Sequence, residues 1–162
     1  MSGRDLVVTR WGARFLGRRL PCAIGRGGMT TDKREGDGAT PLGIYPVSGF
    51  RIFSRKGIGQ PIRRDLIWSD DPRDVHYNDL GFADPVIGYD FSHERLWRAD
   101  RLYDVVIDIG YNRAQIAGKG SAIFIHNWRK PRRPTAGCIA FDPRDLRWLL
   151  SSLTARDRLV IR

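Results

Sequence analysis

The sequence predicts a mainly β fold with one clear helix. Its apolar residues lie mostly in short runs that glycine, proline and aspartate separate, which is typical of strands joined by turns. Only one segment has the spacing of a buried helix. With 162 residues, 41% hydrophobic and 28% charged, the chain is long enough for one globular domain, residues 1–162. The expected strands are 5–10, 20–24, 44–52, 103–109, 121–127, 137–141 and 157–162.

The strand at 103–109 has the clearest alternation. Val105, Ile107 and Ile109 would point to one side, and Asp104 and Asp108 to the other, as expected for a strand with one apolar face. The run at 20–24 ends at a glycine-rich break. The sequence therefore predicts a set of short strands, each ended by turn-forming residues.

The helix is predicted over residues 143–153. Asp142 is a suitable N-cap, and Pro143 fits the first helical position. The leucines at 146, 149, 150 and 153 follow the i, i+3, i+4, i+7 pattern of one buried stripe. By contrast, residues 55–101 show little periodicity, and we expect a long loop-rich insertion there, with at most one short helix.

The net charge of +10 comes mainly from arginines scattered from Arg4 to Arg162. Scattered charge is typical of a solvated surface. No zinc-finger spacing, RNA-binding signature or helix-turn-helix is visible, so we expect no nucleic-acid partner. No apolar run reaches the roughly 20 residues that span a bilayer, and no signal peptide is visible near Met1. We therefore expect no stable membrane insertion, and we expect a monomer.

His126 and Cys138 are the residues with the clearest chemical meaning. His126 ends an apolar run, and Cys138 follows Gly137 and opens another. Cysteine becomes a strong nucleophile when a base removes its proton, and histidine is the usual base. The alternative interpretation is a core cysteine and a buried histidine. Cys22, in a short apolar run, is expected to be a small buried hydrophobe, and a disulfide between the two cysteines remains open.

Two motifs in the right order give the sequence a family resemblance. The segment GDGATPLGIY at 36–45 is similar to an Asp-Gly-x-Thr-Pro-x-Gly entry segment, and His126 with TAGC at 135–138 is similar to an active-site motif. Together they resemble the L,D-transpeptidase catalytic domain, also called the YkuD-type domain. The segments SHERLWR at 92–98 and DIGYN at 108–112 resemble the same family.

The resemblance implies a β-sandwich-like domain with a lid over its site, acting on peptidoglycan stem peptides by cysteine acyl transfer. It makes Cys138 the nucleophile and His126 the general base and acid. Backbone N–H groups of Gly137 and Cys138 are the candidate oxyanion donors. It implies no metal or organic cofactor, and the substrate implies the periplasm. The candidate substrate-binding residues are Arg129, Arg132, Arg133, Thr135, Tyr111, Asn112 and His93.

These assignments differ in their basis. Arginine forks suit the carboxylates of stem peptides, whereas His93 with Glu94 fits an exposed pair as well as a substrate-facing one. The motif segment at Asp37 is expected to be structural. The histidines at 76 and 93 and the nearby aspartates have no metal-site spacing. The chain also departs from the family pattern, with Ala136 and Ala140 where many members have polar side chains.

Two other functions remain open on sequence grounds. A hydrolase on the same scaffold, a carboxypeptidase or an amidase, would use water in place of the acceptor amine. A non-catalytic basic module would bind an anionic polymer or nucleic acid, and its binding would weaken steeply with salt. The departures at Ala136 and Ala140 also leave a variant linkage between stems open.

Overall fold

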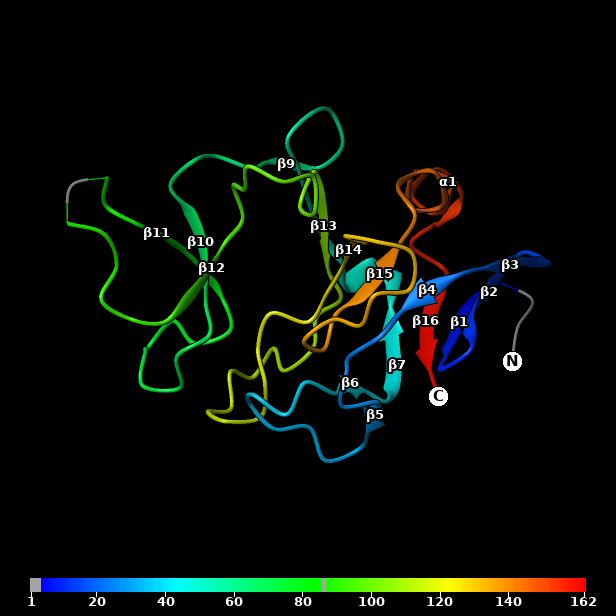
Figure 1. Ribbon diagram of the computed structural model, residues 1–162, viewed down its shortest axis with the longest axis horizontal. Coiled ribbons are helices and arrows are strands. Elements are labelled where there is room, and N and C mark those ends of the chain that lie inside the picture. Colours follow the sequence, from blue (N-terminus) through cyan, green and yellow to red (C-terminus); the bar gives the residue numbers. More distant parts are fainter. Residues whose placement is uncertain (1–3, 86) are drawn as a thin grey trace.

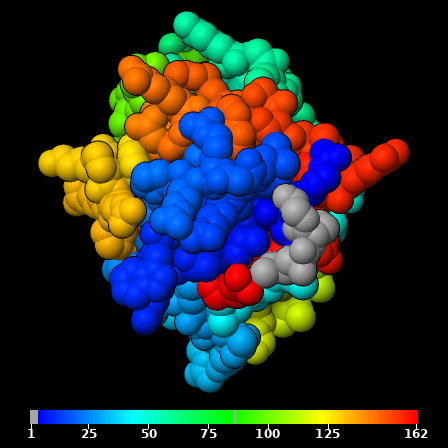
Figure 2. Space-filling view, turned by 90° about the vertical axis from the view of Figure 1, so that its right-hand side faces the viewer, coloured from blue at the N-terminus to red at the C-terminus, as the bar shows by residue number. Residues whose placement is uncertain are grey.

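The computed structural model describes residues 4–85 and 87–162, and they form two packed β-sheets with a third, smaller sheet beside them (Figure 1). The five-stranded sheet has the order β3-β2-β1-β16-β7. Its strands are β1 (Asp5–Thr9), β2 (Gly12–Phe15), β3 (Arg18–Leu20), β16 (Arg158–Ile161) and β7 (Gly43–Pro46). Its N-terminal strands form much of the face seen in Figure 2.

The six-stranded sheet is the central layer, in the order β4-β15-β14-β13-β8-β9. Its β14 and β15 run parallel to each other. Its strands are β4 (Cys22–Ala23), β15 (Ile139–Phe141), β14 (Phe124–Asn127), β13 (Val105–Asp108), β8 (Arg51–Ser54) and β9 (Gln60–Pro61).

The expected insertion forms a three-stranded sheet, β11-β10-β12, at the left of Figure 1. Its strands are β10 (Leu66–Ser69), β11 (Leu80–Phe82) and β12 (His93–Arg95). The short helix that we allowed for is not found in the described part of residues 55–101. A pair of two-residue strands, β5 (Met29–Thr30) and β6 (Thr40–Pro41), completes the β-structure.

Two expected strands are each divided between sheets. The run at 44–52 becomes β7 and β8, separated by a 3-10 turn, η1 (Val47–Gly49), and the run at 20–24 becomes the end of β3 and β4. Pro46 is the last residue of β7, and it has no N–H to donate to a sheet. Strands β2, β5 and β6 were not predicted, and neither were β9 to β12, which lie where a loop-rich insertion was expected. The remaining strands overlap the predicted runs, and the mainly β fold class is confirmed.

The helix α1 (Pro143–Ser152) matches the prediction to within one residue. The Asp142 carboxylate accepts a hydrogen bond from the Arg144 N–H at 2.8 Å and caps the first turn. Leu146 and Leu149 are almost completely buried. The apolar stripe therefore anchors the helix against the sheets.

The central sheet is buried on both faces, and alternation along its strands separates two cores. Ile107 and Ile125 point into the larger core, which the five-stranded sheet and α1 complete. Val106 and Phe124 point into a second core, which Trp68 and Leu96 of the insertion complete. Cys138 belongs to this second core. The site is therefore on the face that the insertion covers.

Candidate active site

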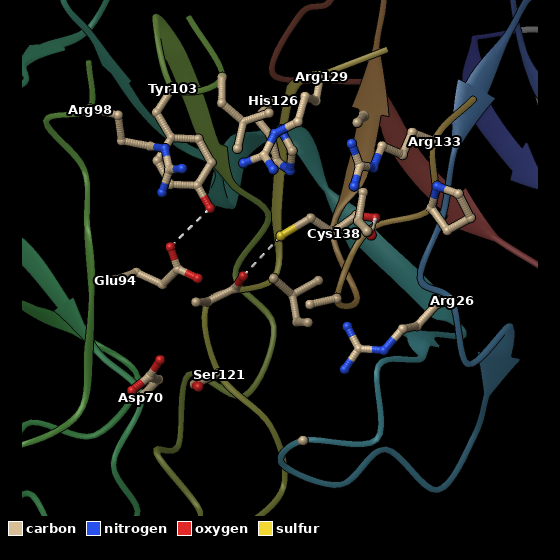
Figure 3. Close-up of a pocket in the computed structure, with 18 of the residues that line it drawn as sticks. Arg26, Asp70, Glu94, Arg98, Tyr103, Ser121, His126, Arg129, Arg133 and Cys138 are labelled. Carbon is tan, nitrogen blue, oxygen red and sulfur yellow. Dashed lines mark hydrogen bonds between the residues drawn. The ribbon is translucent and has the colours of Figure 1, made fainter. Parts of the chain in front are cut away.

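A cavity of about 430 Å³ lies between the central sheet and the insertion, and both Cys138 and His126 line it (Figure 3). Its size is in the range of small-molecule binding sites. The insertion contributes Asp70, Glu94 and Arg98 to the walls. The long insertion thus forms one side of the site.

The strand register explains why Cys138 and His126 share this cavity. In the parallel pair β14–β15, Ile125 lies beside Ile139 and His126 beside Ala140. Side chains two positions apart on a strand point to the same face, so Cys138, Ala140 and His126 face the cavity together. Both cysteines are free, which excludes a disulfide between Cys22 and Cys138 in this structure.

The Cys138 thiol is buried and neutral in this structure. Its side chain donates to the Ala122 carbonyl at 3.1 Å and accepts from the Phe124 N–H at 3.4 Å. Burial raises the pKa of Cys138 to about 12, and the negative charge of Glu94 adds to the increase. To act as a nucleophile, this thiol would need a base to remove its proton.

His126 is positioned as such a base. Its Nδ1 lies 2.7 Å from the Asn127 carbonyl oxygen, which can only accept, so Nδ1 carries the proton and Nε2 keeps its lone pair. Burial lowers the pKa of His126 to about 4. The Tyr103 ring packs edge-on against the imidazole, 5.2 Å between centroids. The imidazole is therefore neutral at neutral pH and oriented by the protein.

Two threonines fix the backbone at Gly137 and Cys138. Thr40 donates to the Gly137 carbonyl at 2.8 Å, and Thr135 donates to the Cys138 carbonyl at 2.6 Å. The Gly137 N–H, expected as an oxyanion donor, donates to the Thr135 hydroxyl at 3.1 Å. It is thus already engaged in the free protein, and of the two expected donors the Cys138 N–H is the better candidate.

The segment at Asp37 has a structural role, as expected. The Asp37 carboxylate accepts from the Ala39 N–H, from the Arg34 N–H and from the buried Lys33 ammonium. These bonds shape the turn that leads into Thr40.

The cavity walls carry opposite charges. Arg26 and Arg133 lie on the Cys138 side in Figure 3, and Glu94 and Asp70 lie on the insertion side. Arg98, also on the insertion side, is paired through two bonds of 3.0 Å with Asp100. The site therefore has a cationic wall and an anionic wall.

The structure brings some of the expected substrate-binding residues together and not others. Arg129, Arg133 and Thr135 line the cavity with Cys138. Arg132 has a positive φ of 56° and lines a separate groove beside β2 and β3. The same loop thus sends its arginines to different surfaces.

Tyr111, Asn112 and His93 are outside the cavity lining. Tyr111 donates to the Lys119 carbonyl at 2.6 Å, and the Asn112 amide donates to the Ile116 and Gly120 carbonyls at 3.0 Å. His93 contacts the Phe91 carbonyl and packs against Tyr89. These side chains hold loops in place.

Tyr103 and Arg26 line the cavity but were not predicted as site residues, and Glu94, for which the sequence left a substrate-facing role open, lines it as well. The period of two along β12 was the available signal for Glu94, because His93 and Glu94 must face opposite sides of a strand. No comparable signal marked Arg26, which reaches the site from a loop of the N-terminal half. In the described residues, no group of three or more potential metal ligands is found.

A family model for the L,D-transpeptidase catalytic domain, YkuD, matches residues 5–161. The chain belongs to this family. Among solved structures, an L,D-transpeptidase from Mycobacterium smegmatis is similar at 13% identity and a TM-score of 0.40. The match covers 93% of this chain but 52% of that one. No curated protein matches.

The family membership agrees with the two motifs that the sequence pointed to, both of which border the cavity. Thr40 and the TAGC segment meet through the Thr40–Gly137 hydrogen bond. Ala136 and Ala140, where many L,D-transpeptidases have polar side chains, line the cavity as well. No helix in the described residues is long and apolar enough to cross a membrane.

Proposed function

We propose that this domain is a peptidoglycan L,D-transpeptidase that joins peptide stems through a thioester on Cys138. The observation that carries the proposal is that Cys138 and an oriented, neutral His126 open into one cavity in a chain of this family. Stem peptides would be both donor and acceptor, and the site of action would be the periplasm. The protein would act as a monomer without a metal or organic cofactor.

In the first half of the reaction, the Cys138 proton leaves its bond to Ala122 and passes to Nε2 of His126. The thiolate attacks the carbonyl carbon of the donor stem, and the Cys138 N–H stabilises the oxyanion. The C–N bond to the terminal residue then breaks. The imidazolium gives its proton to the leaving amine, which departs neutral, and the donor remains as a thioester.

In the second half, a neutral acceptor amine attacks the thioester carbon. His126 takes a proton from the attacking nitrogen, the C–S bond breaks, and the proton returns to the sulfur. The products are an amide between two stems and the original thiol. Arg26 and Arg133 on the cationic wall would hold donor carboxylates, because guanidinium groups bind carboxylates through paired hydrogen bonds.

Intact-protein mass spectrometry with disaccharide-tetrapeptide tests this proposal, with chromatography of the products. We expect a transient adduct and cross-linked dimers with the native protein and with Cys22→Ala, a matched control outside the cavity. Cys138→Ala should give neither. Adduct with trimmed monomers alone would identify a hydrolase. No adduct would contradict acyl transfer and favour the binding module.

A further inference from the structure

The anionic wall contains two carboxylates that the proposed mechanism does not use. Glu94 lies on β12 beside Trp68 of β10, and its carboxylate accepts the Tyr103 hydroxyl at 3.2 Å. Asp70 lines the same cavity, and its Oδ1 is buried without a hydrogen-bond partner. In the part of the chain that the structure describes, neither carboxylate forms an ion pair.

The two carboxylates repel each other. Burial raises the pKa of Glu94 and the charge of Asp70 raises it further, whereas the Tyr103 hydrogen bond and the charges of Arg98 and His93 lower it without cancelling the increase. Arg98 is the cation nearest to this wall in the cavity lining, but Asp100 already holds its guanidinium. A partly buried carboxylate that forms no ion pair gains when a cation joins it. The wall therefore favours a ligand group that carries a positive charge.

We propose that Glu94, with Asp70 near it, binds the protonated amine of the acceptor stem. This inference rests on the proposed function. Cys138 lies between this wall and the cationic wall of Arg26 and Arg133 (Figure 3). A ligand with an ammonium group at one end and a carboxylate at the other would be oriented across the thioester, with its amine on the insertion side.

The chemistry of transfer agrees with this place for the amine. An amine arrives mainly as the ammonium ion near neutral pH. Bound at Glu94, it releases one proton to solvent, and the resulting neutral amine attacks the thioester. The second proton then passes to His126 and on to the sulfur. Glu94 thus makes the site selective for acceptors with a free amine.

Equilibrium binding tests the inference without chemistry. Calorimetry on the Cys138→Ala protein would measure the affinities of two ligands. One is a tripeptide stem with a free side-chain amine, and the other is the same stem with that side-chain amine acetylated. We expect the free amine to bind about tenfold to a hundredfold more tightly, the usual range for one hydrogen bond to a charged group. Glu94→Gln keeps an acceptor for Tyr103 and should bring the two affinities together. Asp65→Asn, a carboxylate paired with Arg63 outside the cavity, should preserve the difference.

Equal affinities for the two stems in the Cys138→Ala protein with Glu94 intact would overturn the inference. A preference for the free amine that survives Glu94→Gln would overturn it as well. Absence of binding by either stem would count against it too. Acyl-enzyme formation by the protein with Cys138 intact is measured separately. An acyl-enzyme adduct together with equal binding of the two stems would contradict only the role of Glu94. Tighter binding of the free amine without any adduct would contradict only the transfer reaction.

Discussion

The hydroxyl of Thr40 donates to the carbonyl of Gly137 at 2.8 Å, although 97 positions separate the two residues. The same oxygen accepts the Gly25 N–H at 2.8 Å, and Thr40 is completely buried. One hydroxyl thus joins the entry segment to the backbone just before Cys138. The two motifs that carry the family resemblance are therefore in direct contact in the structure.

Replacing Thr40 with valine removes this hydroxyl with little change of shape. Two buried backbone groups lose their partner, and we expect the free energy of unfolding to fall by about 2 to 6 kcal/mol. Thr40→Ser keeps the hydroxyl and should lose clearly less. Denaturant unfolding measures both variants. Equal loss in the two would show that the methyl group, rather than the hydrogen bonds, is what matters.

The Cys138 thiol should react slowly in the free protein. With a pKa of about 12 rather than 9.0, its thiolate at pH 8 is about a thousandfold rarer than that of an unperturbed cysteine. Alkylation by iodoacetamide, followed by peptide mass spectrometry, measures the rate. Rapid labelling of Cys138 at pH 8 would contradict a neutral resting thiol.

Glu94→Gln should accelerate this alkylation, because the charge of Glu94 raises the pKa of Cys138. Cys22 provides an internal control, since burial raises its pKa to about 12 with no contribution from Glu94. Its rate should stay the same in the variant. Faster labelling of both cysteines would indicate loosening of the fold instead.

Much of this arrangement could be predicted from the sequence where local patterns decide it. Alternation placed Ile107 on a core face, and cap and stripe residues located α1. The spacing of His126 and Cys138 fits two neighbouring strands. Long-range packing decided the rest. Glu94 reaches the cavity only because β12 pairs with β10 in one register, and Arg132 leaves it because of a left-handed backbone conformation.

Loop contacts were a second limit of prediction. Tyr111 and Asn112 follow a strand near the site, which favoured a place in the cleft. Their hydrogen bonds to the carbonyls of Lys119, Ile116 and Gly120 depend on how the following loop folds back. Sequence spacing does not reveal such a path.

His126 should set a pH dependence of stability. In the unfolded chain its imidazole takes up a proton below about pH 6.5, whereas in the folded protein this happens only near pH 4. The unfolded state therefore binds more protons between these values, and the free energy of unfolding falls as the pH drops from 6.5 to 4. His126→Gln should lessen this decrease in denaturant titrations at pH 7, 5.5 and 4.5. An unchanged slope would contradict a buried neutral imidazole.

Gly137 should resist substitution for two reasons. Its φ of +142° is unfavourable for other residues, and a Cβ there would meet the Ala39 carbonyl oxygen at 3.0 Å and Ile123 at 3.1 Å. We expect Gly137→Ala to reduce stability by about 2 to 5 kcal/mol. Gly118→Ala has a φ of +76° but open space around the new Cβ, and should cost about 1 to 2 kcal/mol. Similar losses of stability in the two variants would show that the neighbours of Gly137 move to make room for the new Cβ.

Asn78 should affect the reactivity of the Cys138 thiol, although it does not contact the sulfur. Its side-chain oxygen accepts the Trp68 indole N–H at 3.1 Å and the Ala122 N–H at 3.0 Å. Its amide donates to the Tyr111 and Asn112 carbonyls at 2.9 Å. This one buried side chain thus ties the insertion to the residue whose carbonyl accepts the Cys138 thiol.

Asn78→Ala removes these four hydrogen bonds, although the Asn112 carbonyl keeps the Gln115 N–H as a partner. We expect a loss of about 3 kcal/mol or more in the free energy of unfolding. Ala122, which has a positive φ of 51°, should relax once its N–H is free, so alkylation of Cys138 should become faster. Asn78→Asp keeps both acceptor bonds and loses the two donated ones, so it should destabilise the protein while changing the Cys138 rate less. If both variants changed the alkylation rate equally, the hydrogen bond from the Ala122 N–H to Asn78 would not be what couples Asn78 to Cys138.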